Sequence, residues 1–173
     1  MLVGSVHLSP ESFKKMLRNK KSPLRAILFG GSIAGAIDIG AASLINATSV
    51  SVILKAVASG VLGSASFQGG AKAAWLGVVL QWLMSLLIAA VFVVATRRIP
   101  WTRQQWVGAG LAYGVVIFFV MNYVVVPFSM VGHRPHLTPR HFAEDMLAML
   151  LFGLIIAFFA RNLPEAHART PMR

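Results

Sequence analysis

The chain contains no cysteine, which excludes disulfides, thiolate metal sites, cysteine-ligated iron–sulfur clusters and cysteine nucleophiles. It is also poor in charge: charged residues make up 12% of its 173 residues. A soluble domain of this size usually carries about 25%. Hydrophobic residues account for 57% of the chain. This composition is typical of a single-domain membrane protein.

Sequence motifs of known catalytic centres are also missing. The chain has no GxSxG, HExxH, P-loop or dinucleotide-binding pattern. Serine, histidine and aspartate are present, but at no spacing that specifies a triad. Haem ligation would need a histidine well inside an apolar run, and none is there. We therefore expect a protein that is not an enzyme and needs no cofactor.

Long apolar runs are what the sequence does contain. At ~1.5 Å per residue, each run reaches about 28 Å or more, close to the ~30 Å hydrocarbon core of a bilayer. They predict an all-α polytopic membrane protein with a four-helix transmembrane bundle in residues 24–161. A basic amphipathic segment, 1–23, precedes the bundle and a cytoplasmic tail, 162–173, follows it. The four predicted spans are 24–45, 73–96, 106–126 and 142–160.

The basic residues flank the spans, as residues that determine membrane topology do. The net charge is +11, but this placement argues against nucleic acid as a partner. With four spans and both termini in the cytoplasm, 12 of the 16 basic residues lie inside and four outside. The inner set is Lys14, Lys15, Arg18, Lys20, Lys21, Arg25, Arg97, Arg98, Arg103, Arg161, Arg169 and Arg173, and the outer set is Lys55, Lys72, Arg134 and Arg140.

The outer segment 46–72 is itself fairly apolar. Val50, Leu54, Val57 and Val61 recur in it at helical spacing, over about 13 residues, which is too short to span. We expect an extra helix that is interfacial or re-entrant on the outer side. A fifth span here would weaken the charge asymmetry and leave Lys55 in the membrane, at a cost of roughly 2.5–3.5 kcal/mol.

The N-terminal segment places Phe13, Met16 and Leu17 on one helix face, with basic residues around them. Such a helix can bind anionic lipid at the membrane surface. The same charges can also serve only to orient the first span. Both interpretations remain open from the sequence.

Small residues in the first span form a stripe that includes an acid. Gly31, Gly35, Asp38 and Ala42 share one helix face. Small residues allow helices to approach closely, and intramembrane carboxylates face the bundle interior or water. We therefore expect Asp38 to contact protein or water, and Gly35→Leu to disturb the bundle.

Each of the other spans also places a polar side chain in the outer half of the membrane. We expect a cluster of Asp38, Gln81, Asn122 and either Glu144 or Asp145, with Arg134, Arg140 or His141 as its cation. The glycine pairs Gly31/Gly35 and Gly110/Gly114 are expected to bring the first and third spans together, and Asp38 close to Asn122. The cluster is either interhelical glue or a pocket for a small solute or a proton.

Three histidines, His133, His136 and His141, lie near the last outer loop. Imidazole is a common ligand of zinc and copper. Their spacing, with two prolines between them, does not put them on one helix face. We therefore favour a solvated loop and expect no metal site.

Three stretches carry a resemblance to a known family. They are GGSIAGAID in the first span, ASGVLGSASFQGG in the outer segment and GLAYGVVIFFVMNYVVVPFS in the third span. Over roughly residues 25–161 the chain resembles the YagU-like family of small bacterial inner-membrane proteins. The resemblance implies a bacterial inner-membrane location and brings no substrate, cofactor or site residue.

Two functions follow as expectations. The first is a non-enzymatic bundle that packs with itself, as a homo-oligomer, or with a membrane-protein partner. The alternative is a small transporter or proton-linked channel in which Asp38 is the binding carboxylate.

Overall fold

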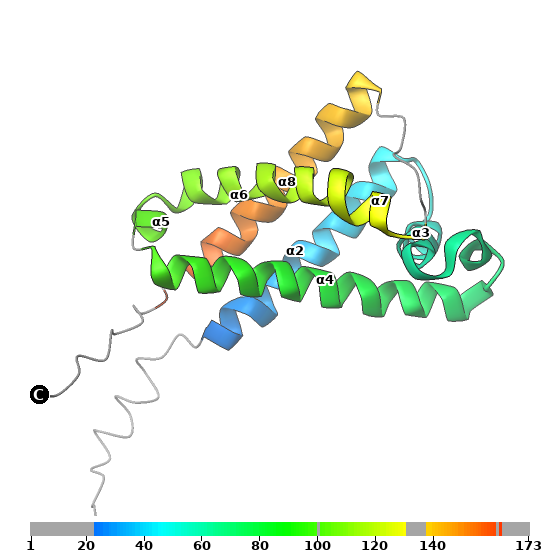
Figure 1. The fold of residues 1–173 in the computed structure, drawn as a ribbon, viewed down its shortest axis with the longest axis horizontal. Coiled ribbons are helices and arrows are strands. Elements are labelled where there is room, and N and C mark those ends of the chain that lie inside the picture. Colours follow the sequence, from blue (N-terminus) through cyan, green and yellow to red (C-terminus); the bar gives the residue numbers. More distant parts are fainter. Residues whose placement is uncertain (1–22, 100, 131–137, 162, 164–173) are drawn as a thin grey trace, which may run out of the picture.

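The computed structural model describes residues 23–99, 101–130, 138–161 and 163, and every regular element in these ranges is helical. The prediction of an all-α chain is confirmed for this part. Residues 1–22, 131–137 and 164–173 lie outside it, and with them the basic amphipathic segment, Arg134, His133 and His136. The helices are α2 (Pro23–Ile45), α3 (Val50–Leu62), η1 (Gly63–Phe67), α4 (Gly70–Arg98), α5 (Trp101–Gln104), α6 (Trp106–Val120), η2 (Met121–Val125), α7 (Val126–Phe128) and α8 (Pro139–Ala160) (Figure 1).

Four long helices, α2, α4, α6 and α8, make up most of the described residues. The third of them continues from α6 through η2 and α7 without a break. The turn η2, near the C-terminal end of this helix, is π-helical. The second predicted span is longer than expected, beginning at Gly70 and ending at Arg98. At the start of α8, Thr138 Oγ1 accepts a hydrogen bond from His141 N at 3.3 Å, and Pro139 occupies the first turn, where no amide is needed.

Length and apolarity make five of the described helices able to cross a membrane, one more than the sequence predicts. The fifth is Val50–Phe67, which comprises α3 and η1. These criteria alone therefore do not give the number of spans.

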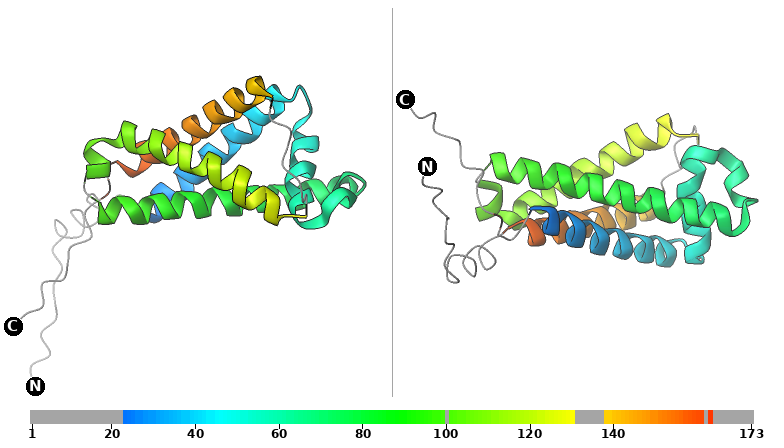
Figure 2. Two further views of the ribbon diagram at one scale, coloured as in Figure 1. Left: turned by 45° about the horizontal axis from the view of Figure 1, so that its top comes forward. Right: turned by 90° about the horizontal axis from the view of Figure 1, so that it is seen from below.

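Helices α2 and α4 run antiparallel. Gly31 lies against Ser85 and Leu86, whereas Asp38, further along α2, bonds Gln81, which comes earlier in α4. The end of α2 and the start of α4 thus lie at the same end of the bundle. The segment that joins them, with α3 and η1, both leaves and returns to that end (Figures 1 and 2).

Helices α6 and α8 are antiparallel as well. Gly110 lies against Ala157 and Leu154, and Gly114 against Met149. Glycines on both helices bring the two backbones into direct contact, since Gly153 of α8 faces Gly110 and Gly114.

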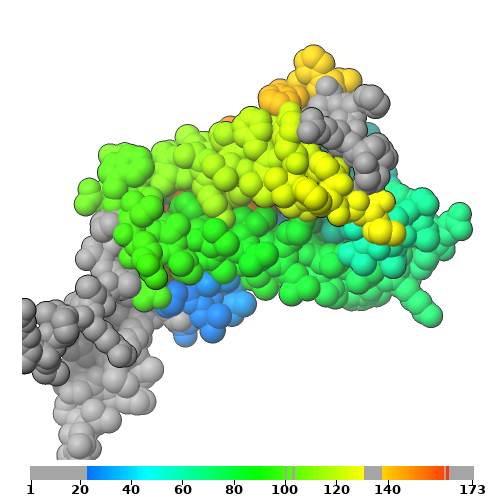
Figure 3. Space-filling model, viewed as in Figure 1, coloured from blue at the N-terminus to red at the C-terminus, as the bar shows by residue number. Residues whose placement is uncertain are grey.

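The long helices pack in the order α6, α8, α2, α4, so that α8 contacts both α6 and α2. Helices α4 and α6 are consecutive long helices, but they meet chiefly at Tyr113. Its hydroxyl donates to Ile88 O at 2.7 Å, and its ring lies 4.9 Å from that of Phe92. Figure 3 shows the face on which α6 and α4 lie one above the other.

Helix α3 crosses the end of the bundle where α2 ends and α4 begins (Figure 2). It packs on α4 where Gly77 lies against the backbone of Leu54, with a Cβ built at Gly77 only 2.6 Å from the Leu54 carbonyl carbon. Met130 N donates to Gly60 O at 2.9 Å and ties the end of α7 to α3. Leu54 is buried, whereas Val50 and Val61 are exposed.

The prediction that the glycine pairs bring the first and third spans together is wrong. Gly31 and Gly35 pack against α4, and Gly110 and Gly114 pack against α8. Small residues permit close approach but do not specify which helix approaches.

Candidate functional site

Asp38 and Gln81 join α2 to α4 in the interior of the bundle. Gln81 Nε2 donates to Asp38 Oδ2 at 2.9 Å. One turn before Asp38, Gly35 lies against Ser85, which is one turn after Gln81. The close approach at Gly35 therefore sets the separation at which the amide reaches the carboxylate. Asp38 thus contacts protein, as the small-residue stripe predicts.

A cavity of about 170 Å³ opens beside this hydrogen bond, between α2, the α6–η2 helix and α8. It brings together three residues of the predicted cluster, Asp38, Asn122 and Asp145, along with Ala42 of the stripe. Its other lining residues are Ile45, Phe118, Ala148 and Met149.

Asn122 lines the cavity without bonding to Asp38. Its Nδ2 donates instead to Phe118 O, at 3.0 Å, within its own helix. Asn122 lies in the π-helical turn η2, and π-turns inside α-helices often occur at functional sites. The expected proximity of Asp38 and Asn122 is present, but its cause is the packing of α8 between their helices.

Asp145 is the acid of α8 that shares the cavity with Asp38. The two carboxylates are close enough for their charges to interact. Within the described ranges, no arginine or lysine lies within ion-pair distance of either carboxylate, and Asp145 makes no hydrogen bond through its side chain.

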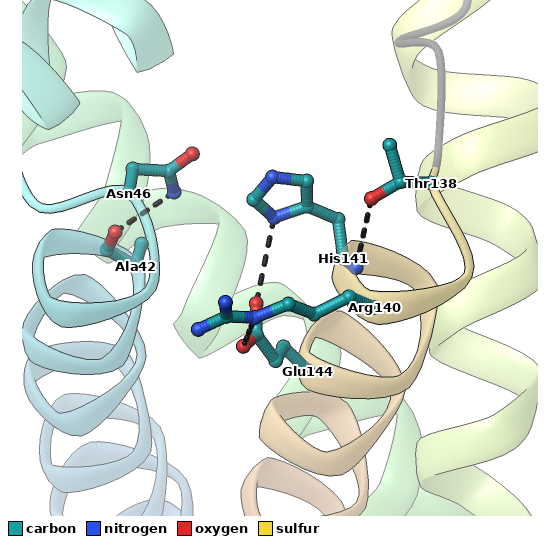
Figure 4. A network of polar contacts seen from close by, with 6 residues as sticks. All are labelled: Ala42, Asn46, Thr138, Arg140, His141 and Glu144. Atoms are coloured by element: carbon teal, nitrogen blue, oxygen red, sulfur yellow. Dashed lines mark hydrogen bonds and ion pairs between the residues drawn. The ribbon is translucent and has the colours of Figure 1, made fainter.

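Glu144 lies outside the cavity and has its own cations. Its Oε1 accepts from Arg140 Nε at 2.8 Å, and its Oε2 lies 3.4 Å from His141 Nδ1 (Figure 4). Across from them, at the end of α2, Asn46 Nδ2 donates to Ala42 O at 2.8 Å. The ion pairs of Arg140 and His141 are thus with Glu144, which corrects the prediction that Arg140 is the cation beside Asp38. His141 also interacts electrostatically with Asp145, so it is the predicted cation that lies near the cavity.

A second, smaller cavity of about 30 Å³ lies on the other side of Asp38. It passes between α4, α6 and α8, past Gln81 and Ser85. Three methionines line it, Met84, Met121 and Met149.

A third cavity, of about 270 Å³, lies between α4 and α6, and its lining is entirely apolar apart from the tyrosine. Asp38 and Gln81 of the predicted cluster line the small cavity, but the other residues that line these two cavities were not predicted from the sequence. A signal was present, because Gln81, Met84, Ile88 and Val91 recur at helical spacing on one face of α4.

In the described part of the chain, no group of three or more histidine, cysteine, aspartate or glutamate side chains is placed to hold a metal ion. Of the three histidines considered, only His141 falls within these residues.

No protein-family model, curated protein sequence or solved structure matches the chain. The resemblance to the YagU-like family stays a prediction.

Proposed function

We propose that this chain is a four-span, non-enzymatic protein of the bacterial inner membrane whose cavity at Asp38 and Asp145 binds a proton or another small cation. The antiparallel arrangement of α2 and α4 supports four spans. A segment that crossed the membrane between them would make the two helices parallel. The intervening α3 lies across the end of the bundle, as an interfacial helix would.

The distribution of charge supports an orientation with both termini in the cytoplasm. Among the residues that the structure describes, the basic ones at the end of the bundle where α2 begins and α4 ends are Arg25, Arg97, Arg98, Arg103 and Arg161. At the other end they are Lys55, Lys72 and Arg140. The more basic end belongs on the inner side.

Reporter fusions test this topology. We expect alkaline phosphatase, which is active only outside the inner membrane, to be active when fused after Lys72 and inactive after Arg103 or Arg173. Green fluorescent protein should give the opposite pattern. An active phosphatase after Arg103 would mean that residues 46–69 cross the membrane.

The observation that supports cation binding is that two carboxylates, Asp38 and Asp145, line one cavity. Among the described residues, the one hydrogen bond to either of them comes from the neutral amide of Gln81. Charged groups at membrane depth are costly unless they are paired, and like charges in one site repel. A proton or small cation from the outer side would remove both costs. Glu144 illustrates the contrast, because its charge is already matched by that of Arg140.

The alternative interpretation, a cluster that serves only as interhelical glue, requires the polar groups to satisfy one another. Among the described residues of the cluster, only the Asp38–Gln81 hydrogen bond crosses between the long helices, and Asn122 bonds within its own helix. If these side chains only held the helices together, Asp38, Asn122 and Asp145 would bond to one another, but they line a cavity instead. We therefore favour a binding site.

The experiment is pH-difference infrared spectroscopy on the full chain in nanodiscs, comparing Asp38→Asn with the parent. Asparagine keeps the shape and the bond to Gln81 but takes up neither a proton nor a cation. We expect a carboxyl band that titrates in the parent and disappears in Asp38→Asn. Sodium or potassium should reduce this band if a metal ion competes with the proton.

Glu144→Gln is the matched control, since it removes a carboxylate outside the cavity. It should leave the Asp38 band in place. If Asp38→Asn folds as the parent does and gives the same titrating bands, Asp38 serves only packing and the cation-binding proposal fails.

A further inference from the structure

The three cavities around Asp38 follow one another through shared residues. The outer cavity and the small one have Asp38 and Met149 in common. The small cavity and the apolar cavity between α4 and α6 have Met84, Ile88, Ile117 and Met121 in common. A single path therefore leads from two carboxylates, past Gln81, to an apolar groove between α4 and α6 that is open on its outer side, where Leu87 and Val116 are exposed.

The groove between α4 and α6 is suited to the apolar part of a small molecule. Tyr113 is its one residue with a polar group, and that hydroxyl is occupied by Ile88 O. The volume of about 270 Å³ is too small for a transmembrane helix. Two turns of a helix about 10 Å across and ~11 Å long fill roughly 800 Å³.

The connection between groove and carboxylates is narrow but adaptable. The small cavity has a volume of only about 30 Å³, and Met84 and Met121 lie between it and the groove. Methionine side chains are unbranched and flexible, and they are common on surfaces that accept varied ligands. Movement of these two side chains would widen the path without moving the backbone.

We propose that the ligand of this site is an amphipathic organic cation, with its ammonium group at Asp38 and its apolar tail in the groove between α4 and α6. The inference rests on the proposed function, because the carboxylate that takes a small cation also takes the ammonium. It adds a substrate class, since neither an inorganic cation nor a proton uses the groove.

The test is equilibrium dialysis of radiolabelled octylammonium against the full chain in nanodiscs of neutral lipid, with empty nanodiscs subtracted. We expect saturable binding. Octanol has the same tail without the charge and should compete about tenfold or more less well, since a charge-assisted hydrogen bond is lost. Octanoate should not compete.

Two pairs of variants test where the ammonium group and the apolar tail of the ligand bind. Asp38→Asn should weaken binding about tenfold or more, and Glu144→Gln should not change it. Val116→Phe places a ring in the groove and should also weaken binding. Val115→Phe is its matched control, because Val115 is the adjacent residue, is 37% exposed and does not line the groove. Both valines are partly exposed, so neither change should prevent folding.

The outcomes separate this inference from the proposed function. A titrating Asp38 band without saturable octylammonium binding would overturn the inference and leave the proposed function intact. Binding that is unchanged in Asp38→Asn or in Val116→Phe would also overturn the inference. Absence of both the band and the binding would overturn both proposals.

Discussion

Gly114→Leu is expected to separate α6 from α8 and to lower the free energy of unfolding by more than about 3 kcal/mol, above the usual range for overpacking. A Cβ at Gly114 would lie 2.5 Å from Met149 O and 2.8 Å from Leu150 Cα. These are backbone atoms of α8, so no side-chain rotation relieves the overlap. The whole helix has to move, and it carries contacts to α2 as well.

Gly108→Leu is the matched control for this change. Gly108 is in the same helix, and a Cβ there meets no atom within 4 Å. Its effect should be within about 0.5 kcal/mol, as for ordinary surface substitutions. Thermal and denaturant unfolding of the two variants in detergent measures the difference. Equal stability for both would show that α6 and α8 do not pack through Gly114.

Gly35→Leu is expected to lower the free energy of unfolding by about 2 kcal/mol or more through overpacking. A Cβ at Gly35 would lie 3.0 Å from Ser85 Cβ and would overlap Ser85 Oγ. Ser85 is 2% exposed, so its hydroxyl has little room to turn away. Displacing α4 here also pulls Gln81 from Asp38, so the titrating carboxyl band should shift together with the stability.

Two further variants distinguish this contact from a general effect of leucine. Gly40→Leu, in the same helix, meets nothing within 4 Å and should be tolerated. Made on its own, Gly35→Ala should lower the stability of the protein. Part of that loss should be recovered when it is combined with Ser85→Gly. If the two changes are additive in a double-mutant cycle, the Gly35–Ser85 contact does not hold α2 against α4.

The sequence predicted the helices and the environment of Asp38 because both depend on local periodicity. Apolar runs of 19 residues or more have few alternatives to a helix at membrane depth. Gly31 and Gly35 share a face with Asp38, so a carboxylate on that stripe had to meet another helix. The amide of Gln81 lies at a matching depth on the next span, and the structure places it against that carboxylate.

What the sequence left open depends on how the helices are arranged around one another. Glu144 and Asp145 are neighbours that differ by about 100° of rotation on a helix. The choice between them follows from how α8 turns toward α2. No residue pattern predicted the π-helical turn at Met121, which leaves Asn122 bonded to its own helix.

The place of α8 in the bundle has a consequence for how the protein is made. It is the last of the four long helices to leave the ribosome, yet α2 and α6 both pack on it. In the proposed topology the α2–α4 pair can assemble during synthesis, whereas α6 enters the membrane before α8 exists, with Gly110 and Gly114 facing lipid. Assembly is then completed only after translation of α8, and a chain truncated before Pro139 would leave α6 with little more than its Tyr113 contact to α4, as a target for quality-control proteases.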